Sequence, residues 1–234
     1  MNNSFLDHDG IAKIEVANGI LVYQCDFDVN GYYPELFQEL SIIFPKALSK
    51  AVNKRQSEYL AGRYVAHYAL SKLGIDVYDI PSRKDRSPTW PKGVSGSITH
   101  TNKKAICAVG YSNQCELLGL DCEFWIEPHT ENGIKHLIIN EKEQFVLSTL
   151  DWTNEQSLTL AFSAKESLFK ALYPKVQKYF NFNDARITSI SLEDNTFTIQ
   201  LEKDLDTDFP RSSVFKGIFI ADHYEILTIV FKLA

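Results

Sequence analysis

The segment 162–174, FSAKESLFKALYP, constrains this chain most, because it predicts a largely buried helix that also carries charged groups. Ala, Leu, Lys and Glu dominate it, and Pro174 is expected to close it. Apolar residues recur at helical spacing through the segment and the turn before it. Glu166 and Lys170 lie four residues apart on one side of the helix. An ordinary surface ion pair would explain these two residues, so by themselves they predict no site.

Lys165 is the first indication that this helix does more than pack. It follows Leu158 by seven residues and Phe162 by three, where the apolar stripe calls for a hydrophobic side chain. The helix therefore offers one acid and two lysines within two turns.

Composition and charge narrow the class of protein. The chain has 234 residues, of which 44% are hydrophobic and 12% aromatic, which is typical of a globular protein of one large or two ordinary domains. The net charge of −6 argues against general nucleic-acid binding. Acids are concentrated in 116–143 and 193–208, whereas 46–104 is basic. A basic first half predicts a site for a phosphate-rich ligand.

Three features predict a soluble protein of the cytoplasm. The four cysteines show neither a CxxC nor a zinc-binding spacing, which indicates a reducing compartment. No apolar run approaches the ~20 residues of a membrane span. Residues 1–16 lack a basic region followed by an apolar core, so we expect no signal peptide.

The first half of the chain is predicted to fold as strands around one long helix. The predicted elements are a hairpin over 10–29 turning at Asn18-Gly19, a short helix within 32–44, a helix over 50–73 ended by Gly74, a basic loop over 81–96, and two strands over 97–110 turning at 102–103. Arg55 and Arg63 share a face of the long helix. Solvated surface arginines would explain both. His100 ends a strand beside hydroxyl residues and follows a basic loop, which suits an anion site.

The second half begins with an apolar strand, 117–124, that carries two acids. Asp121 and Glu123 project from the same face, and paired carboxylates repel each other unless a cation or proton holds them. Because the strand looks buried, we favour a metal site over a solvent-facing edge. The elements predicted after it are a helix over 140–150 with Asn140 as N-cap and Glu143 at N3, a helix over 156–173, strands within 187–199 and 214–231, and an acidic loop over 202–211.

The two halves repeat the same order of elements and meet near 112–116. We therefore predict an α+β protein of two comparable lobes, 1–114 and 115–234.

The charged residues together predict chemistry on a phosphorylated ligand. Asp121, Glu123 and Glu166 suit a hard cation such as Mg²⁺, and Mn²⁺ would also fit. Basic residues upstream suit phosphate groups; they are Arg55, Arg63, Arg83, Lys84, Arg86 and His100. Neither a P-loop nor a GxGxxG fingerprint is present. From the residues alone, a Mg²⁺-dependent phosphohydrolase or nucleotidyltransferase stays open.

Four segments in order resemble a known family. They are RQSEYLAGR (55–63), SPTWPKGVSGSITH (87–100), GLDCE (119–123) and FSAKESLFKALYP (162–174). They resemble the surfactin-type 4′-phosphopantetheinyl transferases, and within them the subgroup typified by the enterobactin synthetase component. The resemblance covers roughly 50–190.

The resemblance implies a fold and an activity. The fold would be a pseudo-symmetric monomer of two similar lobes with coenzyme A in the cleft between them. The first lobe would hold the 3′-phosphate and adenine side, and the second the metal and catalytic residues. The activity would be Mg²⁺-dependent transfer of the phosphopantetheine arm of coenzyme A to a serine of an acyl, aryl or peptidyl carrier protein, releasing 3′,5′-ADP. Siderophore or nonribosomal peptide carriers are the first expectation, with fatty-acid or polyketide carriers as the alternative. A non-catalytic coenzyme A-binding module also stays open.

Site residues follow from the resemblance, motif by motif. Asp121, Glu123 and Glu166 resemble the metal acids, and Cys122 could meet the metal only through its backbone carbonyl. The residues that resemble those gripping the 3′-phosphate are Arg55, Arg63 and His100, with Thr99 keeping a hydroxyl where serine is usual. Arg83 is the first choice for a nucleotide contact, with Lys84 and Arg86 as alternatives.

The same resemblance assigns roles in the reaction. Glu166, directly or through a water, would take the proton of the carrier serine. Lys170 would neutralise the transferring phosphate or protonate the departing 3′,5′-ADP, and Lys165 would bind a phosphate or the pantetheine arm. The segment 126–150 is the candidate surface for the acidic helices of a carrier, although an ordinary surface loop and helix would explain it equally well.

Overall fold

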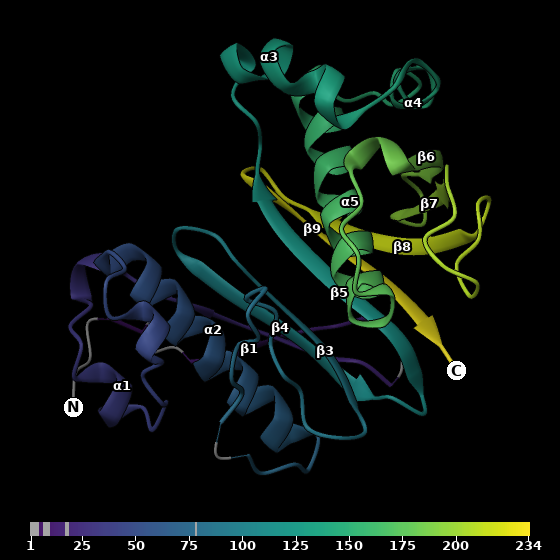
Figure 1. The fold of residues 1–234 in the computed structure, drawn as a ribbon. Coiled ribbons are helices and arrows are strands. Elements are labelled where there is room, and N and C mark those ends of the chain that lie inside the picture. Colours follow the sequence, from purple (N-terminus) through teal and green to yellow (C-terminus); the bar gives the residue numbers. More distant parts are fainter. Residues whose placement is uncertain (1–4, 7–9, 17–18, 78) are drawn as a thin grey trace. The chain divides into compact units, whose positions relative to one another are not determined.

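The computed structural model describes residues 5–6, 10–16, 19–77 and 79–234 (Figure 1). The chain divides into two compact units, one formed by 1–116 with residue 234 and the other by 117–233. Helices and strands are mixed, and the strands form two sheets. These observations agree with an α+β class. The pseudo-symmetric relation of the lobes and the cleft stay predictions.

The first unit contains a four-stranded antiparallel sheet in the order β1-β2-β4-β3. Its strands are β1 (Ala12–Ile14), β2 (Leu21–Asp26), β3 (Val94–His100) and β4 (Lys104–Tyr111). Both predicted hairpins are present as paired strands. Residues 17–18 of the first turn, and residues 1–4 and 7–9 of the segment considered for a signal peptide, lie outside the described residues.

One long helix, α2 (Asn53–Lys72), packs against β2 and β4. It ends as predicted at Gly74, whose φ of +81° favours glycine. The described residues before it include the short helices η1 (Val29–Gly31), α1 (Leu36–Glu39) and η2 (Lys46–Leu48). The helix expected within 32–44 is therefore only four residues long. Ser41 has a φ of +57°, and this left-handed residue ends the helical turn before Pro45.

The second unit contains a five-stranded sheet in the order β5-β9-β8-β7-β6. Its strands are β5 (Cys115–Phe124), β6 (Ala185–Ser191), β7 (Thr196–Leu201), β8 (Val214–Ala221) and β9 (Glu225–Leu233). The helix α5 (Asn154–Val176) lies along this sheet (Figure 1), and its apolar face fills the core together with side chains of the strands.

Gly119 explains how closely α5 approaches β5. A Cβ atom at this position would lie 2.0 Å from the carbonyl oxygen of Ser167 and 2.4 Å from the amide nitrogen of Ala171. Only glycine allows two backbones to meet at such a distance. The contact places the strand residues that follow Gly119 beside the middle of the helix.

Two further helices differ from the prediction. The helix α5 continues through Pro174 to Val176 and ends at Gln177, whose φ is +52°. The expectation that Pro174 closes it was wrong. Proline lacks the backbone amide that would donate to the carbonyl one turn back, but Pro174 lies in the last turn, so the helix loses only a single hydrogen bond.

The helix α3 (Pro128–Ile138) lies where no helix was predicted; Pro128 at its first turn is a start signal. The capping box of α4 (Glu141–Leu147), with Asn140 and Glu143, is confirmed. A short helix, η3 (Phe182–Asp184), follows α5.

Candidate active site

The contact between β5 and α5 gathers charged side chains in the second unit. Asp121 is buried on β5, and its Oδ1 accepts a hydrogen bond from Nζ of Lys170 at 2.7 Å. Lys170 therefore pairs across to the strand. The local pair with Glu166, considered from the spacing, is therefore not the only partner that Lys170 has.

Glu123 and Glu166 carry the electrostatic signature of clustered acids. Burial, followed by the charge of Asp121, raises the pKa of Glu123 to about 7, although Lys170 opposes the shift. Burial also raises the pKa of Glu166, with Lys170 opposing and Asp121 adding to the effect. Because each acid responds to Asp121 and Lys170, the four groups act as one cluster.

The donor chemistry of this cluster fits a hard divalent cation. Carboxylate oxygens are the ligands that Mg²⁺ and Mn²⁺ prefer. A cation would offset both the burial and the charge of Asp121, which raise the pKa of Glu123 and Glu166. Within the described residues, no group of three or more His, Cys, Asp or Glu side chains is already arranged to hold a metal ion. Cys122 lies on the same strand with its side chain buried, so only its backbone carbonyl stays a candidate ligand.

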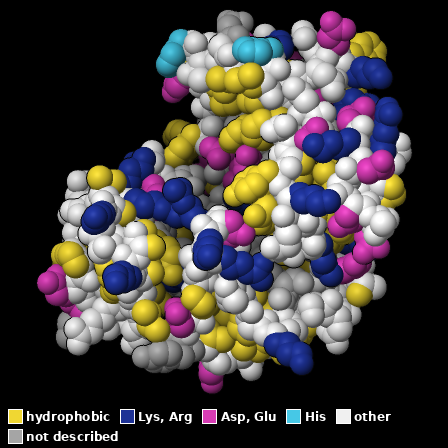
Figure 2. Space-filling view, in the orientation of Figure 1, with side chains coloured by type: hydrophobic (Ala, Val, Ile, Leu, Met, Phe, Trp, Pro, Cys, Tyr) yellow, Lys and Arg dark blue, Asp and Glu magenta, His cyan; other side chains and the backbone are white. Residues whose placement is uncertain are grey.

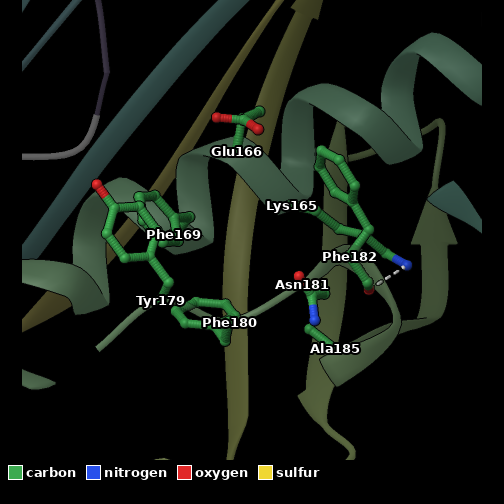
Figure 3. Close-up of a pocket in the computed structure, with 8 residues that line it drawn as sticks. All are labelled: Lys165, Glu166, Phe169, Tyr179, Phe180, Asn181, Phe182 and Ala185. Carbon is green, nitrogen blue, oxygen red and sulfur yellow. Dashed lines mark hydrogen bonds between the residues drawn. The ribbon is translucent and has the colours of Figure 1, made fainter. Parts of the chain in front are cut away.

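An aromatic cavity lies next to Glu166 (Figure 3). It has a volume of about 230 Å³ and is lined on one side by α5 and on the other by the segment that leads into β6. Its lining residues are Lys165, Glu166, Phe169, Tyr179, Phe180, Asn181, Phe182 and Ala185. Phe169 stacks on Tyr179 with ring centroids 5.6 Å apart. The cavity suits a flexible, mostly apolar chain.

Lys165 is placed differently from what its predicted role requires. Its side chain is 2% exposed, and Figure 3 shows it extending away from Glu166 toward Phe182. Its ammonium donates to the carbonyl oxygens of Ile138 at 2.7 Å and Phe182 at 2.9 Å, and to the carboxylate of Glu143. A lysine has three N–H donors, and all three are engaged. In this arrangement, Lys165 has no donor left for a phosphate or a pantetheine arm.

In the first unit, Arg55 near the start of α2 and His100 at the end of β3 lie together. Nη1 of Arg55 is 3.1 Å from Nε2 of His100. Because a guanidinium only donates, Nε2 accepts in this contact. The carboxylate of Glu58 lies 3.5 Å from Arg55 and 3.8 Å from His100. Both basic side chains are about one-third exposed, at 39% and 33%, and so are accessible to an anion.

Arg63 shares a helix face with Arg55 but is turned inward. It is 6% exposed, and it donates to the carbonyl oxygen of Ile80 at 2.6 Å and to the hydroxyl of Ser82 at 2.9 Å. Its guanidinium also lies 4.5 Å from the centre of the Tyr59 ring. These contacts anchor the start of the basic loop to α2. They do not by themselves indicate that Arg63 binds a phosphate directly.

The basic loop is a tight turn with exposed cationic side chains. Ser82 and Pro88 form a β-bridge, and the amide of Arg83 donates to the carbonyl of Ser87 at 2.8 Å. Arg83, Lys84 and Arg86 are exposed, so the structure does not select one of them as the nucleotide contact. Thr99 lies buried on β3, directly before His100.

Two acids beside these groups were missed as site residues. Glu58 stands one helical turn after Arg55, a spacing that could have indicated its contact with the arginine. Glu143 was recognised only as a capping residue. Its contact with Lys165 joins α4 to α5, and no local sequence signal predicts it.

Comparison with known proteins identifies the class. The family model described as 4′-phosphopantetheinyl transferase N-terminal domain matches residues 44–110, and the model of the 4′-phosphopantetheinyl transferase superfamily matches 117–226. The chain belongs to the 4′-phosphopantetheinyl transferase family.

Individual relatives place it with one subgroup. The chain is 36% identical over 145 residues to enterobactin synthase component D of Salmonella typhimurium, a match that covers 62% of this chain and 59% of the relative. The corresponding protein of Salmonella typhi is 34% identical over 71% of this chain and 68% of its own length. The 4′-phosphopantetheinyl transferase PptT of Mycobacterium tuberculosis is 29% identical over 67% and 70%. The recognised resemblance to the component D-like subgroup is confirmed.

No helix in the described part of the chain combines the length and apolar character that crossing a bilayer requires.

Proposed function

We propose that this protein transfers the 4′-phosphopantetheine arm of coenzyme A to a serine hydroxyl of an apo carrier protein and releases 3′,5′-ADP. The observation that carries the proposal is the contact of β5 with α5, which brings Lys170 and Glu166 to Asp121 and Glu123. Membership of the family supports the same conclusion.

Three acids are proposed as metal ligands, namely Asp121, Glu123 and Glu166, with the carbonyl of Cys122 as a further donor. Mg²⁺ bound there would supply positive charge to the pyrophosphate of coenzyme A; Mn²⁺ fits the same donors. Glu166 lies in the same charged cluster as Asp121 and Lys170, and its carboxylate is proposed to accept the proton of the carrier serine, directly or through a water. Lys170, which is 27% exposed, can turn from Asp121 to the phosphate that is transferred.

The first unit is proposed to supply the nucleotide side of coenzyme A. Arg55 and His100 form an accessible pair of basic groups for the 3′-phosphate, with Thr99 beside His100. Arg83, Lys84 and Arg86 extend the positive surface. Arg63 is proposed to support this side by holding the loop that carries these three residues.

The carrier is proposed to dock on α3 and α4 within 126–150. Leu137 is 56% exposed and Phe145 is 74% exposed. Figure 2 shows hydrophobic side chains at the surface of the α3 region, next to histidines. The helix α3 carries His129 and His136, and Lys142 is exposed on α4. Glu127 and Glu141 are also exposed on this segment, so the proposal rests on the exposed apolar side chains together with the histidines and Lys142, which suit an acidic, amphipathic helix of a partner.

One assay tests the function. The protein is mixed with apo carrier, coenzyme A and Mg²⁺, and the carrier is weighed by mass spectrometry. A gain of one phosphopantetheine arm supports the proposal. Release of phosphate with an unchanged carrier would contradict the transferase and indicate a phosphohydrolase. Binding of coenzyme A without either reaction would indicate a non-catalytic binding module.

A panel of carriers tests the pathway. The relatives named enterobactin synthase component D motivate siderophore-type nonribosomal peptide carriers as the first choice. Faster modification of fatty-acid or polyketide carriers would overturn that choice and leave the transfer activity unaffected. Phe145→Ala should raise KM for the carrier and leave KM for coenzyme A unchanged. An unchanged KM for the carrier would exclude Phe145 from the docking surface.

A further inference from the structure

Lys165 and Glu143 form a buried ion pair directly behind the candidate site. Lys165 lies on α5 and Glu143 on α4, and Nζ is 2.7 Å from Oε1. The side chains are 2% and 0% exposed. Burying two charges is costly, and replacing such a pair by well-packed apolar residues is often neutral or stabilising, so the pair is weak evidence for a role in stability alone.

The hydrogen bonds around this pair are complete. Glu143 accepts from the backbone amides of Asn140 at 3.1 Å and Ile187 at 2.9 Å, in addition to Lys165. Lys165 donates to the carbonyl oxygens of Ile138 and Phe182. Two side chains thereby connect the end of α3, the start of α4, the middle of α5, η3 and the start of β6. A polar network that is fully satisfied fixes the geometry of the elements it joins.

The network adjoins the residues proposed to react. Lys165 immediately precedes Glu166, and the two side chains leave α5 in different directions (Figure 3). The carbonyl that Lys165 binds belongs to Phe182, in the wall of the aromatic cavity opposite α5. Holding Lys165 therefore fixes both the rotation of α5 at Glu166 and the width of the cavity. Burial lowers the pKa of Lys165, and the charge of Glu143 opposes this shift.

We propose that Lys165 and Glu143 act as one positioning device, which sets the orientation of Glu166 and the cavity wall, and that neither charged group binds coenzyme A. This inference rests on the proposed transferase function. It replaces the ligand-binding role expected for Lys165 with a role through Glu166.

A double-mutant cycle tests whether the pair acts as a unit. The variants are Lys165→Met, Glu143→Gln and the two combined, because Gln keeps the shape and one acceptor of Glu143. We expect each single variant to unfold at a lower urea concentration, and the double variant to lose clearly less than the sum of the two losses. Additive losses would overturn the proposal. Lys203→Met is the matched control, since Lys203 pairs with Asp184 at 2.6 Å but is 46% exposed.

Kinetics separate positioning from ligand binding. In the folded variants, kcat should fall at least tenfold while KM for coenzyme A changes less than threefold, and Lys203→Met should change neither. A tenfold rise in KM for Lys165→Met, with Glu143→Gln unaffected, would show that Lys165 binds the ligand. If the double-mutant cycle shows coupling but kcat is unchanged in the variants, Lys165 and Glu143 only stabilise the fold, and the positioning role is overturned. If Lys165→Met does not fold, kcat and KM are measured instead for Glu143→Asp, whose side chain is one methylene shorter. The same outcomes then support or overturn the positioning role.

Hydrogen exchange supplies a readout that does not depend on transfer. Backbone amides of 162–170 and 179–187 should exchange at least tenfold faster in Glu143→Gln than in the wild type, with 53–72 of the first unit unchanged. Equal exchange rates would overturn the proposal. If the wild-type protein modifies no carrier, the proposed transferase function fails. Hydrogen exchange and the double-mutant cycle still decide whether Lys165 and Glu143 hold the segment that carries Glu166.

Discussion

The ammonium of Lys170 lies 2.7 Å from a carboxylate oxygen of Asp121, although 49 positions separate the two residues in the chain. The contact joins a helix to a strand and gives the candidate active site its charge balance. Because Glu123 and Glu166 respond to both members of this pair, a change in Asp121 affects the whole cluster.

Asp121→Asn should abolish most transfer and leave the fold intact. The amide keeps the shape of the side chain but removes the charge that faces Lys170 and the proposed metal. We expect kcat to fall by at least about 100-fold, as when a charged group that stabilises a transition state is lost. The rate is measured by carrier mass and the fold by circular dichroism. Glu193→Gln, in an exposed turn of the same unit, is the control. Near-normal turnover of Asp121→Asn in saturating Mg²⁺ would refute the metal assignment.

Arg55→Ala and Arg63→Ala should have different effects. Arg55 is accessible beside His100, so its loss should raise KM for coenzyme A by about ten- to a hundredfold, the equivalent of a charged hydrogen bond. KM for dephospho-coenzyme A, which lacks the 3′-phosphate, should hardly change. Arg63→Ala should instead lower the free energy of unfolding by about 1–3 kcal/mol, because the buried carbonyl oxygen of Ile80 loses its donor. Equal effects of both variants on KM, without loss of stability, would contradict these roles.

Gly119→Ala should separate β5 from α5. The added methyl group would overlap backbone atoms of Ser167 and Ala171, which cannot move aside as a flexible side chain would. We expect a loss of stability of about 1–3 kcal/mol or more, and a loss of activity in whatever remains folded. Gly133→Ala is the control: its Cβ would meet nothing within 4 Å, and a helical glycine replaced by alanine should gain about 0.5–1 kcal/mol. Thermal unfolding measures both, and a fully stable, active Gly119→Ala would contradict the close approach.

His67 should make the protein less stable in mild acid. Burial lowers its pKa, Arg63 adds to this effect and Asp79 opposes it. Its buried Nε2 has no hydrogen-bond partner among the described residues. Because the unfolded chain binds a proton more readily than the folded one, stability contributed by neutral His67 is present above the unfolded pKa and is lost as pH falls through it toward the lower folded pKa.

His67→Gln, which cannot titrate, should therefore show a smaller loss of stability than the wild type between pH 7 and pH 5. Urea unfolding at several pH values measures the difference. Parallel pH profiles would show that His67 does not contribute.

Much of the fold could be read from local patterns. Alternating apolar residues predicted β6 to β9, and the run before Gly74 predicted α2, because each element needs one apolar face. The capping box of α4 is equally local. The acids of β5 and α5 were also predicted as site residues from the sequence, since their spacing and their neighbours form motifs of a family. By contrast, α3 was missed because Asn132 and Gly133 interrupt its helical pattern, and Pro174 was read as an end although it stands within α5.

The sequence by itself determined which residues carry charge, on which elements they lie and to which family the chain belongs. Only the tertiary structure decided what each charge meets. Lys165 and Lys170 are five residues apart on one helix, yet one is held by Glu143 in the core and the other by Asp121 beside the site. Arg55 and Arg63 likewise share a helix face, but one is accessible and the other anchors a loop. Propensity and periodicity act over a few residues, whereas burial and pairing depend on segments that meet only when the chain packs.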